Sequence, residues 1–532
     1  MDTLYHNGTV ITMERPLRAE AVLVRDGRIA AVGAAAELRA QAQGPLRSAD
    51  LKGCTLLPAF VDAHSHFAAA ASRFLEVSLA GCRTPEEILA RLSEHLRLHP
   101  VPPGQWVRAG GYDHTQLPGC RHLTAIELDR SVPDRPLIVQ HASGHMGVVN
   151  TAALKLLGVP AQADAIPNGV IGVEGGAPTG YLEEAAFLHY LHQLPLPGRE
   201  EFLAAFDRAQ ALYASHGITL VQEGLFTPQL IGPYRDLLRR GGLYLHVVGY
   251  AAPEDFSAVA AAFPRCVGQF HRRLCLAGYK IFLDGSPQGR TAWLRRPYEG
   301  ETEYRGYPAL RDEQVIDALR LAAGTGRQLL AHCNGDAACA QLLRAAAQVI
   351  REGYDLPAVR PVMVHAQLLS PDQLPQVRET GLLPSFFPAH ICHWGDTHLR
   401  NLGPERAARL SPAGSALASG VPFTFHQDTP VLPPDMLETM WCAAVRRTRD
   451  GIILGAEERI SALEALRAVT VRAAWQYFQE EHRGSIAPGK CADFAVLDGT
   501  PLACSPEALH RLRVLATVAG GRTVFRTHDA PF

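Results

Sequence analysis

Eight short apolar runs, most of them separated by stretches with helical periodicity, occupy the middle of this 532-residue chain. Apolar runs of this length between turn residues are typical of buried strands. Strands that alternate with helical stretches favour a parallel sheet covered by helices, and eight such units predict an α/β fold of the (β/α)8 TIM-like barrel type. The predicted strands are residues 56–63, 218–223, 243–250, 279–285, 328–333, 361–366, 382–387 and 422–427.

The two ends of the chain resemble each other and differ from the middle. Residues 1–55 alternate β-like runs with turns, and the pair Asp26-Gly27 is typical of a tight hairpin. Residues 480–532 show the same pattern. Both ends are therefore expected to meet as one small β-sandwich domain, with the barrel at 56–479 inserted between them.

The stretch between the first two predicted strands is far too long for a single helix. Residues from about 68 to 215 are therefore expected to form an insertion after the first barrel strand. Its apolar run at 137–143 predicts a further strand, and other parts of it predict helices. Because loops on such scaffolds vary and carry binding residues, we expect the insertion to shape the pocket.

The composition excludes several classes of function. The chain is 47% hydrophobic and 20% charged with a formal charge of −2, which gives no indication of nucleic-acid or membrane binding. It has no apolar run of roughly 18 residues, and MDTLYHNGTVITME at the N-terminus lacks a basic segment followed by an apolar one, so we expect no secretory signal. Its 11 cysteines lack CxxC spacing and are typical of reduced thiols. We expect a cytoplasmic protein that acts on a small molecule; a homodimer remains an open possibility.

Two histidines follow the first predicted strand directly, in the run LLPAFVDAHSHF at 56–67. Residues two apart on an extended strand face the same side, so His64 and His66 can converge on one metal ion such as zinc. The alternative is that the two histidines form a chance pair and bind no metal, because the chain contains 23 histidines. The reactive groups of a (β/α)8 barrel lie at the C-terminal ends of its strands, which is where this pair falls.

Other predicted strands carry further metal-ligand side chains near the same end. His332 and His365 end the fifth and sixth strands, and Asp428 follows the eighth. Lys280 lies within the fourth, where burial of an unpaired ammonium costs several kcal/mol. The structural alternatives are a core histidine for His365 and a helix cap for Asp428.

This set of side chains resembles the amidohydrolase superfamily, and further phrases narrow the resemblance to its YtcJ-like, amidohydrolase-3 branch, which includes N-substituted formamide deformylases. The resemblance spans nearly the whole chain. The phrases that carry it are GGYDHTQLP (110–118), SGHMGVVNTAAL (143–154), PTGYLEEA (178–185), KIFLDGSPQGRTAWL (280–294), HCNGDAA (332–338), WGDTHLRNLGPERAARLSP (394–412) and GSIAPGKCADFAVLD (484–498).

The resemblance implies two divalent metal ions, for which zinc is expected because imidazoles dominate the ligand set. Lys280 would be carbamylated by CO2 and would bridge the two ions. His64, His66 and Asp428 would hold the more buried ion, and His332 and His365 the other. The implied activity is hydrolysis of a C–N bond by a metal-activated hydroxide, with Asp428 as the base that later protonates the leaving nitrogen.

Four side chains are candidates for substrate binding. By resemblance, His145 lies in a loop that lines the pocket, and Arg290 could hold a carboxylate through two parallel hydrogen bonds. Tyr112 and Trp293 are weaker candidates. A surface histidine and an ordinary salt bridge are the alternatives for His145 and Arg290.

Three other functions remain open on the same scaffold. A cyclic-amide or lactone hydrolase and a deaminase would use the same chemistry on a different bond. A catalytically silent binding or regulatory protein is the alternative from another class, since fold alone does not determine function.

Overall fold

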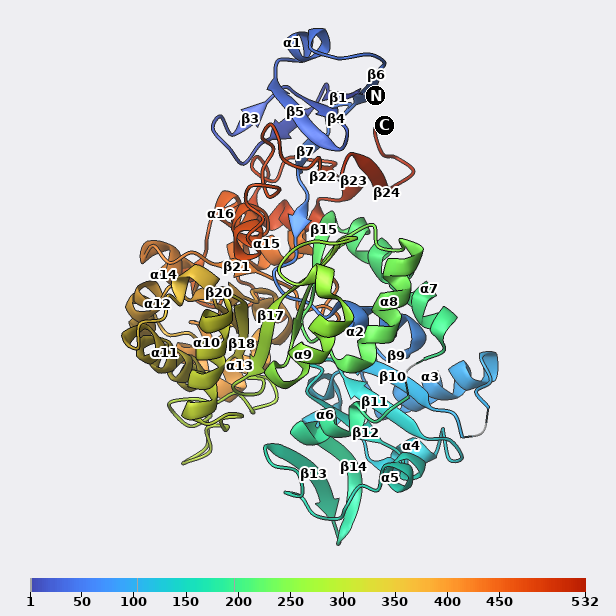
Figure 1. Cartoon of the computed structure of the whole chain (residues 1–532). Coiled ribbons are helices and arrows are strands. Elements are labelled where there is room, and N and C mark those ends of the chain that lie inside the picture. The colour runs from blue at the N-terminus through green and yellow to red at the C-terminus, as the bar shows by residue number, and fades with distance from the viewer. Residues whose placement is uncertain (1, 103, 196) are drawn as a thin grey trace.

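The computed structural model describes residues 2–102, 104–195 and 197–532 (Figure 1). At its centre the predicted parallel sheet is confirmed as one eight-stranded sheet in which every neighbouring pair is parallel. In spatial order its strands are β8 (Phe60–Val61), β15 (Ile218–Glu223), β16 (His246–Ala251), β17 (Leu274–Phe282), β18 (Gln328–Cys333), β19 (Val362–His365), β20 (Leu383–Phe386) and β21 (Thr424–Phe425).

The sheet curls until its two edges approach each other at the C-terminal ends of their strands. No ladder pairs the described residues of β8 with those of β21. Beyond the strands, however, the backbone N–H of His66 donates to the carbonyl of Thr429 at 2.8 Å. This contact joins the segment after the first strand to the segment after the last.

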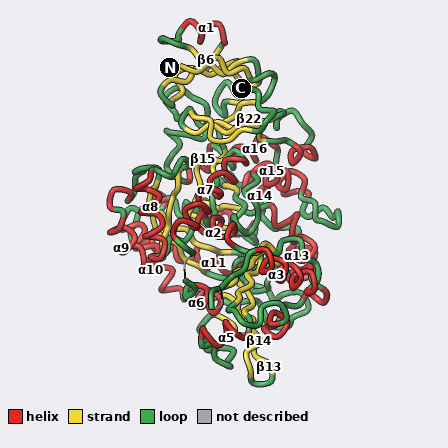
Figure 2. Tube along the Cα trace, turned by 90° about the vertical axis from the view of Figure 1, so that its right-hand side faces the viewer, coloured by secondary structure: helices red, strands yellow, loops and turns green. Residues whose placement is uncertain are grey.

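Strand alternation separates an inner face of the sheet from an outer face. In β18, Leu329 and Ala331 pack in the large outer core, whereas Leu330 belongs to the inner cluster, so His332 also points inward. The outer core is covered by α7 (Arg199–Ser215), α8 (Ile231–Arg240), α9 (Pro253–Ala262), α10 (Asp312–Thr325) and α11 (Asp336–Arg351) (Figures 1 and 2).

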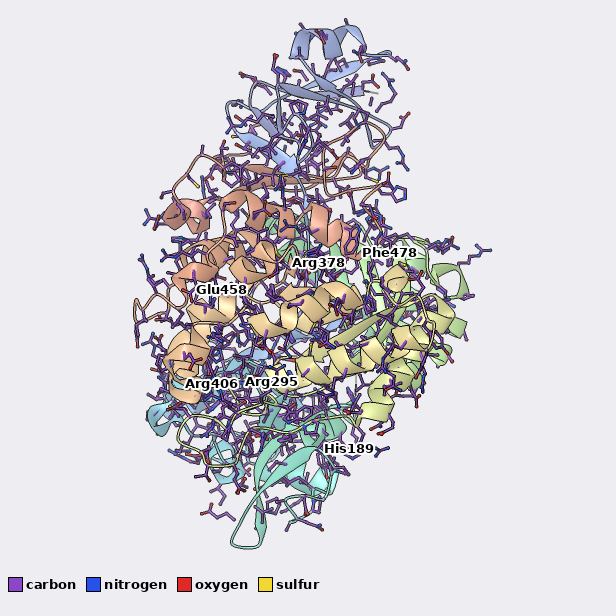
Figure 3. The ribbon with its side chains drawn as sticks, turned by 90° about the vertical axis from the view of Figure 1, so that its left-hand side faces the viewer. His189, Arg295, Arg378, Arg406, Glu458 and Phe478 are labelled. Atoms are coloured by element: carbon purple, nitrogen blue, oxygen red, sulfur yellow. The ribbon has the colours of Figure 1, made fainter. Side chains whose placement is uncertain are left out.

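These helices form where the apolar residues have helical spacing. Helix α11 buries Leu342, Leu343, Ala346 and Val349 on one face, which is the stripe an amphipathic helix needs. Arg378 on α12 (Leu374–Thr380) is exposed, whereas Arg406 on α13 (Ala389–Ala407) is half-buried and donates to the carbonyl of Pro297 (Figure 3). Among the described residues no helix is long and apolar enough to cross a bilayer.

The two ends of the chain join in one sheet. The predicted strand 56–63 is divided, because β7 (Thr55–Pro58) pairs with β22 (Phe494–Leu497) and only β8 enters the barrel. Pro58 has no N–H to continue the ladder, and the chain changes sheets there. The remaining strands of this sheet are β2 (Thr9–Ile11), β3 (Arg18–Ala19), β23 (Val514–Ala519) and β24 (Arg522–Arg526).

A second, four-stranded sheet from the N-terminal segment shares a core with the joined sheet. Tyr5 and Val22 of this sheet pack in one cluster with Phe494 and Val518 of the joined sheet. Its strands are β5 (Arg28–Gly33), β4 (Ala21–Arg25), β1 (Asp2–His6) and β6 (Leu46–Asp50). The domain boundaries at 55 and 480 stay predictions.

The stretch between β8 and β15 contains a separate six-stranded mixed sheet, at the opposite end of the molecule from the two termini (Figure 1). Sequence analysis expected one strand here, at 137–143. The others were missed because they are short or interrupted by glycine, as at Gly180 (φ +97°). In spatial order the strands are β13 (Gly169–Glu174), β14 (Ala177–Glu184), β12 (Met146–Val149), β11 (Leu137–His141), β10 (Val107–Tyr112) and β9 (Val77–Ser78).

Candidate metal centre

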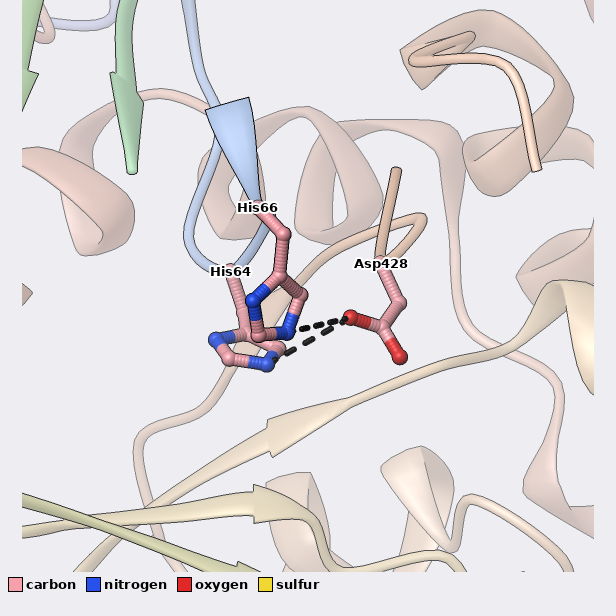
Figure 4. Close-up of side chains that lie close together, drawn as sticks. All are labelled: His64, His66 and Asp428. Atoms are coloured by element: carbon pink, nitrogen blue, oxygen red, sulfur yellow. Dashed lines mark ion pairs between the residues drawn. The ribbon is translucent and has the colours of Figure 1, made fainter. Parts of the chain in front are cut away.

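Two histidines and one carboxylate converge where the first and last strands of the central sheet end (Figure 4). His64 Nε2 lies 3.4 Å from Asp428 Oδ1, and His66 Nε2 lies 3.6 Å from the same oxygen. Both histidines follow β8 in an irregular segment rather than on the extended strand that the sequence suggested. Their rings nevertheless meet at Asp428, because His66 makes a β-bridge to Glu223 that holds the segment in place.

Hydrogen bonds fix which nitrogen of His64 faces this point. The Gln222 amide donates from Nε2 to the Ala63 carbonyl at 3.1 Å, so its Oε1 faces His64 Nδ1 at 2.5 Å. An amide oxygen can only accept, so Nδ1 carries the ring proton. His64 Nε2 is therefore left with a lone pair directed at the interior. Tyr477, which accepts from Gln222 at 2.7 Å, helps to hold the amide in this orientation.

The environment of Asp428 suits a metal ligand. Its Oδ1 is buried and has no hydrogen-bond partner among the described residues, which is costly for a carboxylate unless a cation balances it. Burial raises the pKa of Asp428 to about 6. Zinc ligands at about 2.1 Å in tetrahedral geometry lie roughly 3.4 Å from one another, close to the two distances from Asp428 Oδ1 to the imidazole nitrogens. The residues therefore fit a metal ion.

Lys280 brings an amine into the same cluster. Its Nζ lies 3.4 Å from His64 Nε2, its side chain is 1% exposed, and it forms no ion pair among the described residues. Burial lowers the pKa of this amine to about 8. A large part of it is therefore neutral at mildly alkaline pH, and a neutral amine is the nucleophilic form.

His332 and His365 complete the cluster from the adjoining strands. His332 Nε2 lies 3.1 Å from the carbonyl of Gly285 and 3.1 Å from the amide nitrogen of Asn334, so these two contacts hold the ring through Nε2 and its Nδ1 is left without either of them. The two rings are 4.7 Å apart, and His365 Nε2 lies 3.8 Å from Asp428 Oδ2. His365 has a φ of +68°, so the backbone leaves the extended conformation at this residue.

Two supporting side chains were not found by sequence reasoning. One is Gln222, described above, and the other is His426, whose Nε2 lies 3.0 Å from His365 Nδ1. The second nitrogen of His426 lies 3.0 Å from the hydroxyl of Ser385. A signal was available for His426, because it lies two residues before Asp428 and residues so spaced on a strand share a face.

The match to known proteins agrees with this geometry. Residues 47–525, most of the chain, match the amidohydrolase family. This protein is an amidohydrolase family member. It is 27% identical to the putative amidohydrolase YtcJ of Bacillus subtilis (strain 168) over 99% of each chain. It is 29% identical to an N-substituted formamide deformylase of Arthrobacter pascens over 98% of this chain and 97% of that protein.

A solved structure shares the fold of this amidohydrolase. An uncharacterized metal-dependent hydrolase from Pyrococcus horikoshii OT3 aligns with a TM-score of 0.77 at 24% identity, covering 95% of this chain and 99% of that one. The expected amidohydrolase resemblance is thus confirmed.

Two adjoining cavities open beside the candidate metal centre of the amidohydrolase. The inner one has a volume of about 250 Å³ and is lined by the six predicted ligands and by apolar side chains. The outer one is about 710 Å³. Residues that line both are His145, Leu188, His192, Leu225, Thr227, Lys280 and Phe282.

His145 is the one predicted substrate-binding residue that lines the cavities. Its Nδ1 lies 2.8 Å from Glu184 Oε2, and its ring centroid is 5.1 Å from that of His332. Burial lowers the pKa of His145, but the charge and the hydrogen bond of Glu184, together with the charges of Asp428 and Asp284, outweigh burial and raise it.

The other predicted substrate-binding residues lie elsewhere. Arg290 forms an ion pair with Glu301 at 2.6 Å on the surface and does not line either cavity, so it is not available for a substrate carboxylate there. Tyr112 is fully buried in the core of the insertion sheet, where its hydroxyl lies 2.9 Å from His122 Nδ1. Trp293 packs against the main hydrophobic core and lines neither cavity.

A second group of ligand-type side chains lies in the insertion. Asp113, His114 and His141 approach one another, with 3.0 Å between His114 Nδ1 and His141 Nε2. His141 Nδ1 accepts the backbone N–H of Ser143 at 3.0 Å, and the backbone N–H of His114 lies 3.4 Å from His141 Nε2. Asp113 also accepts from the indole of Trp394 at 3.2 Å. These contacts describe a hydrogen-bonded cluster.

Proposed function

We propose that this amidohydrolase hydrolyses the exocyclic amide bond of a small organic molecule and releases a carboxylic acid and an amine. The observation that carries the proposal is the convergence of the cluster described above on one small, largely apolar cavity. A 29% identical relative named N-substituted formamide deformylase supports a C–N bond as the target.

The proposal includes two divalent ions, with zinc as the expected metal because four of the ligands are imidazoles. His64, His66 and Asp428 would hold one ion, and His332 and His365 the other. Carbamylated Lys280 would bridge them, since a buried, partly neutral amine can react with CO2 and its product is anionic. When bound, the ions would make hydroxide available near neutral pH and polarise the substrate carbonyl.

The side chains of the protein would then handle the protons and the substrate. Asp428 accepts the proton of the attacking water and later delivers it to the leaving nitrogen, because its carboxylate faces the centre without another partner. The apolar walls, such as Leu188 and Leu225, exclude bulk water and strengthen the local electrostatics. His145 is placed at the junction of the two cavities to donate a hydrogen bond to the substrate.

Product analysis tests the proposal. Protein purified without chelator is incubated with a panel of N-formyl and N-acyl amines, and the acid and the amine are quantified by mass spectrometry. We expect equimolar acid and amine from at least part of the panel, and none with His64→Ala. Release of ammonia from amino-substituted rings, or ring opening to a single product, would instead support a deaminase or a cyclic-amide or lactone hydrolase. Ligand binding without turnover of any class would support a silent binding protein.

A further inference from the structure

We propose that Glu184 is a positioning residue that holds His145 as a hydrogen-bond donor toward the substrate carbonyl. The identity of the substrate in this inference rests on the proposed amide hydrolysis. Glu184 ends β14 of the insertion, whereas the candidate ligands come from the barrel. The inference therefore gives the insertion a specific part in the reaction.

The contacts between the two residues determine the orientation of the imidazole. Glu184 Oε2 can only accept, so His145 Nδ1 carries a proton toward it at 2.8 Å. The backbone N–H of Glu184 donates to the carbonyl of His145 at 2.7 Å, so the two residues are joined through main chain and side chain. The Nε2 of His145 is then the nitrogen left for the cavities, and 16% of the side chain is exposed there.

The carboxylate of Glu184 is itself held from the barrel side. Its Oε1 accepts from the Thr291 hydroxyl at 2.7 Å. A Cβ placed on Gly285 would lie 2.3 Å from the same Oε1, so only glycine leaves room for the carboxylate at this point. Gly285 also provides the carbonyl that orients His332. One short loop thus positions both the Glu184–His145 pair and a candidate metal ligand.

The backbone of Glu184 is strained. Its φ of +49° and ψ of −124° lie in a region that residues with a side chain rarely adopt. Such residues persist only where the surrounding structure determines them, and they cluster at functional sites. A glycine would adopt this conformation more readily, so the carboxylate is present at a cost to the fold.

The chemical consequence is a preorganised donor. As an amide carbonyl becomes tetrahedral its oxygen gains negative charge, and a fixed N–H aimed at that oxygen stabilises the transition state more than the ground state. The Glu184 carboxylate lies 2.8 Å from Nδ1 and is held there by Thr291, so its charge stabilises a ring that keeps Nδ1–H on the carboxylate and presents a second N–H, on Nε2, to this oxygen. The effect of losing Glu184 should therefore fall mainly on kcat.

The test compares Glu184→Gln with a matched control in the metal-loaded enzyme. The neighbouring Glu183 contacts Tyr181 at 2.6 Å and Tyr307 at 3.2 Å and lines neither cavity, so Glu183→Gln removes the same charge beside the site. On an amide that the wild type hydrolyses, we expect Glu184→Gln to lower kcat by about 10- to 100-fold with little change in KM, and Glu183→Gln to stay within about twofold. Equal kcat values for the two variants would overturn the inference.

A second variant and a spectroscopic signal keep the test independent of folding and of substrate choice. Glu184→Gly relieves the backbone strain, so it should melt at or above the wild-type temperature while losing kcat as Glu184→Gln does. Proton NMR of histidine-labelled protein should show a downfield His145 N–H resonance that both Glu184 variants lose. Its retention in them would refute the pairing. Absence of amide turnover in the wild type would refute the proposed function, whereas the resonance would still report on the pair.

Discussion

Gln222 Oε1 accepts a 2.5 Å hydrogen bond from His64 Nδ1, although the two residues are 158 positions apart in the chain. This bond leaves His64 Nε2 as the nitrogen that faces Asp428. Side chains that orient a metal-ligating histidine through its other nitrogen tune metal affinity. We therefore expect Gln222 to affect the metal affinity of the candidate centre, although its amide contacts the ring nitrogen that points away from the centre.

Replacing Gln222 tests this role. Gln222→Leu removes the acceptor and should weaken metal binding by about 10- to 100-fold, because His64 can then place its proton on either nitrogen. Gln222→Glu keeps an acceptor at the same position and should bind metal more tightly than the leucine variant. Metal dissociation constants from competition with a chromophoric chelator measure both. Equal affinities of the two variants would contradict the assignment.

Lys280 provides a pH test on protein stripped of metal. Burial lowers its pKa from 10.5 to about 8, so between these values the unfolded chain binds more protons than the folded one. Stability therefore rises with pH across this window. Relative to Lys280→Met, the free energy of unfolding of the wild type should increase by about 2 kcal/mol from pH 8 to pH 10. Parallel pH profiles from urea unfolding would show that the amine is not desolvated.

Asp428→Asn separates metal binding from proton transfer. The amide oxygen can still face the cation, but it cannot accept the proton of water. We expect the variant to retain metal and to lose about 10²- to 10⁴-fold in kcat. Metal analysis and steady-state kinetics on the same preparation measure the two effects. A rate near that of the wild type would mean that another base operates.

Replacing His426 should weaken metal binding at only one of the two predicted ion positions. A metal ion on His365 Nε2 would place the ring proton on Nδ1, and His426 Nε2, 3.0 Å away, would accept it. His426→Leu should therefore weaken binding of the ion near His365 and His332 by about 10- to 100-fold and spare the ion near His64. His426→Gln, which keeps an acceptor, should restore part of that affinity. Two-phase metal titration distinguishes the sites, and uniform weakening of both would count against this role.

The barrel strands could be predicted from the sequence because short, nearly continuous apolar runs bounded by turn residues are characteristic of strands buried on both faces. The sequence could also predict that the candidate ligands at the strand ends lie close together, because parallel strands bring their C-terminal ends to one edge of the sheet. His332 illustrates this: its strand neighbour Leu330 packs inside the barrel, so the histidine must also face inward.

The supporting contacts could not be predicted in the same way. Gln222 and Glu184 act through partners that only the folded chain brings near them, at separations of 158 and 39 residues. Arg290 was placed in the pocket by resemblance, but Glu301, eleven residues further on, neutralises it at the surface. The insertion sheet was largely missed because short strands with glycines carry little periodicity.

Anomalous X-ray scattering from crystals of protein purified without chelator tests the central claim most directly. Data collected on both sides of the metal absorption edge should give two peaks per chain. One peak should lie between His64, His66 and Asp428, and the other should lie beside His332 and His365, with density joining both to Lys280. Absence of any peak within ligand distance of His64 in fully metal-loaded, active protein would contradict the account.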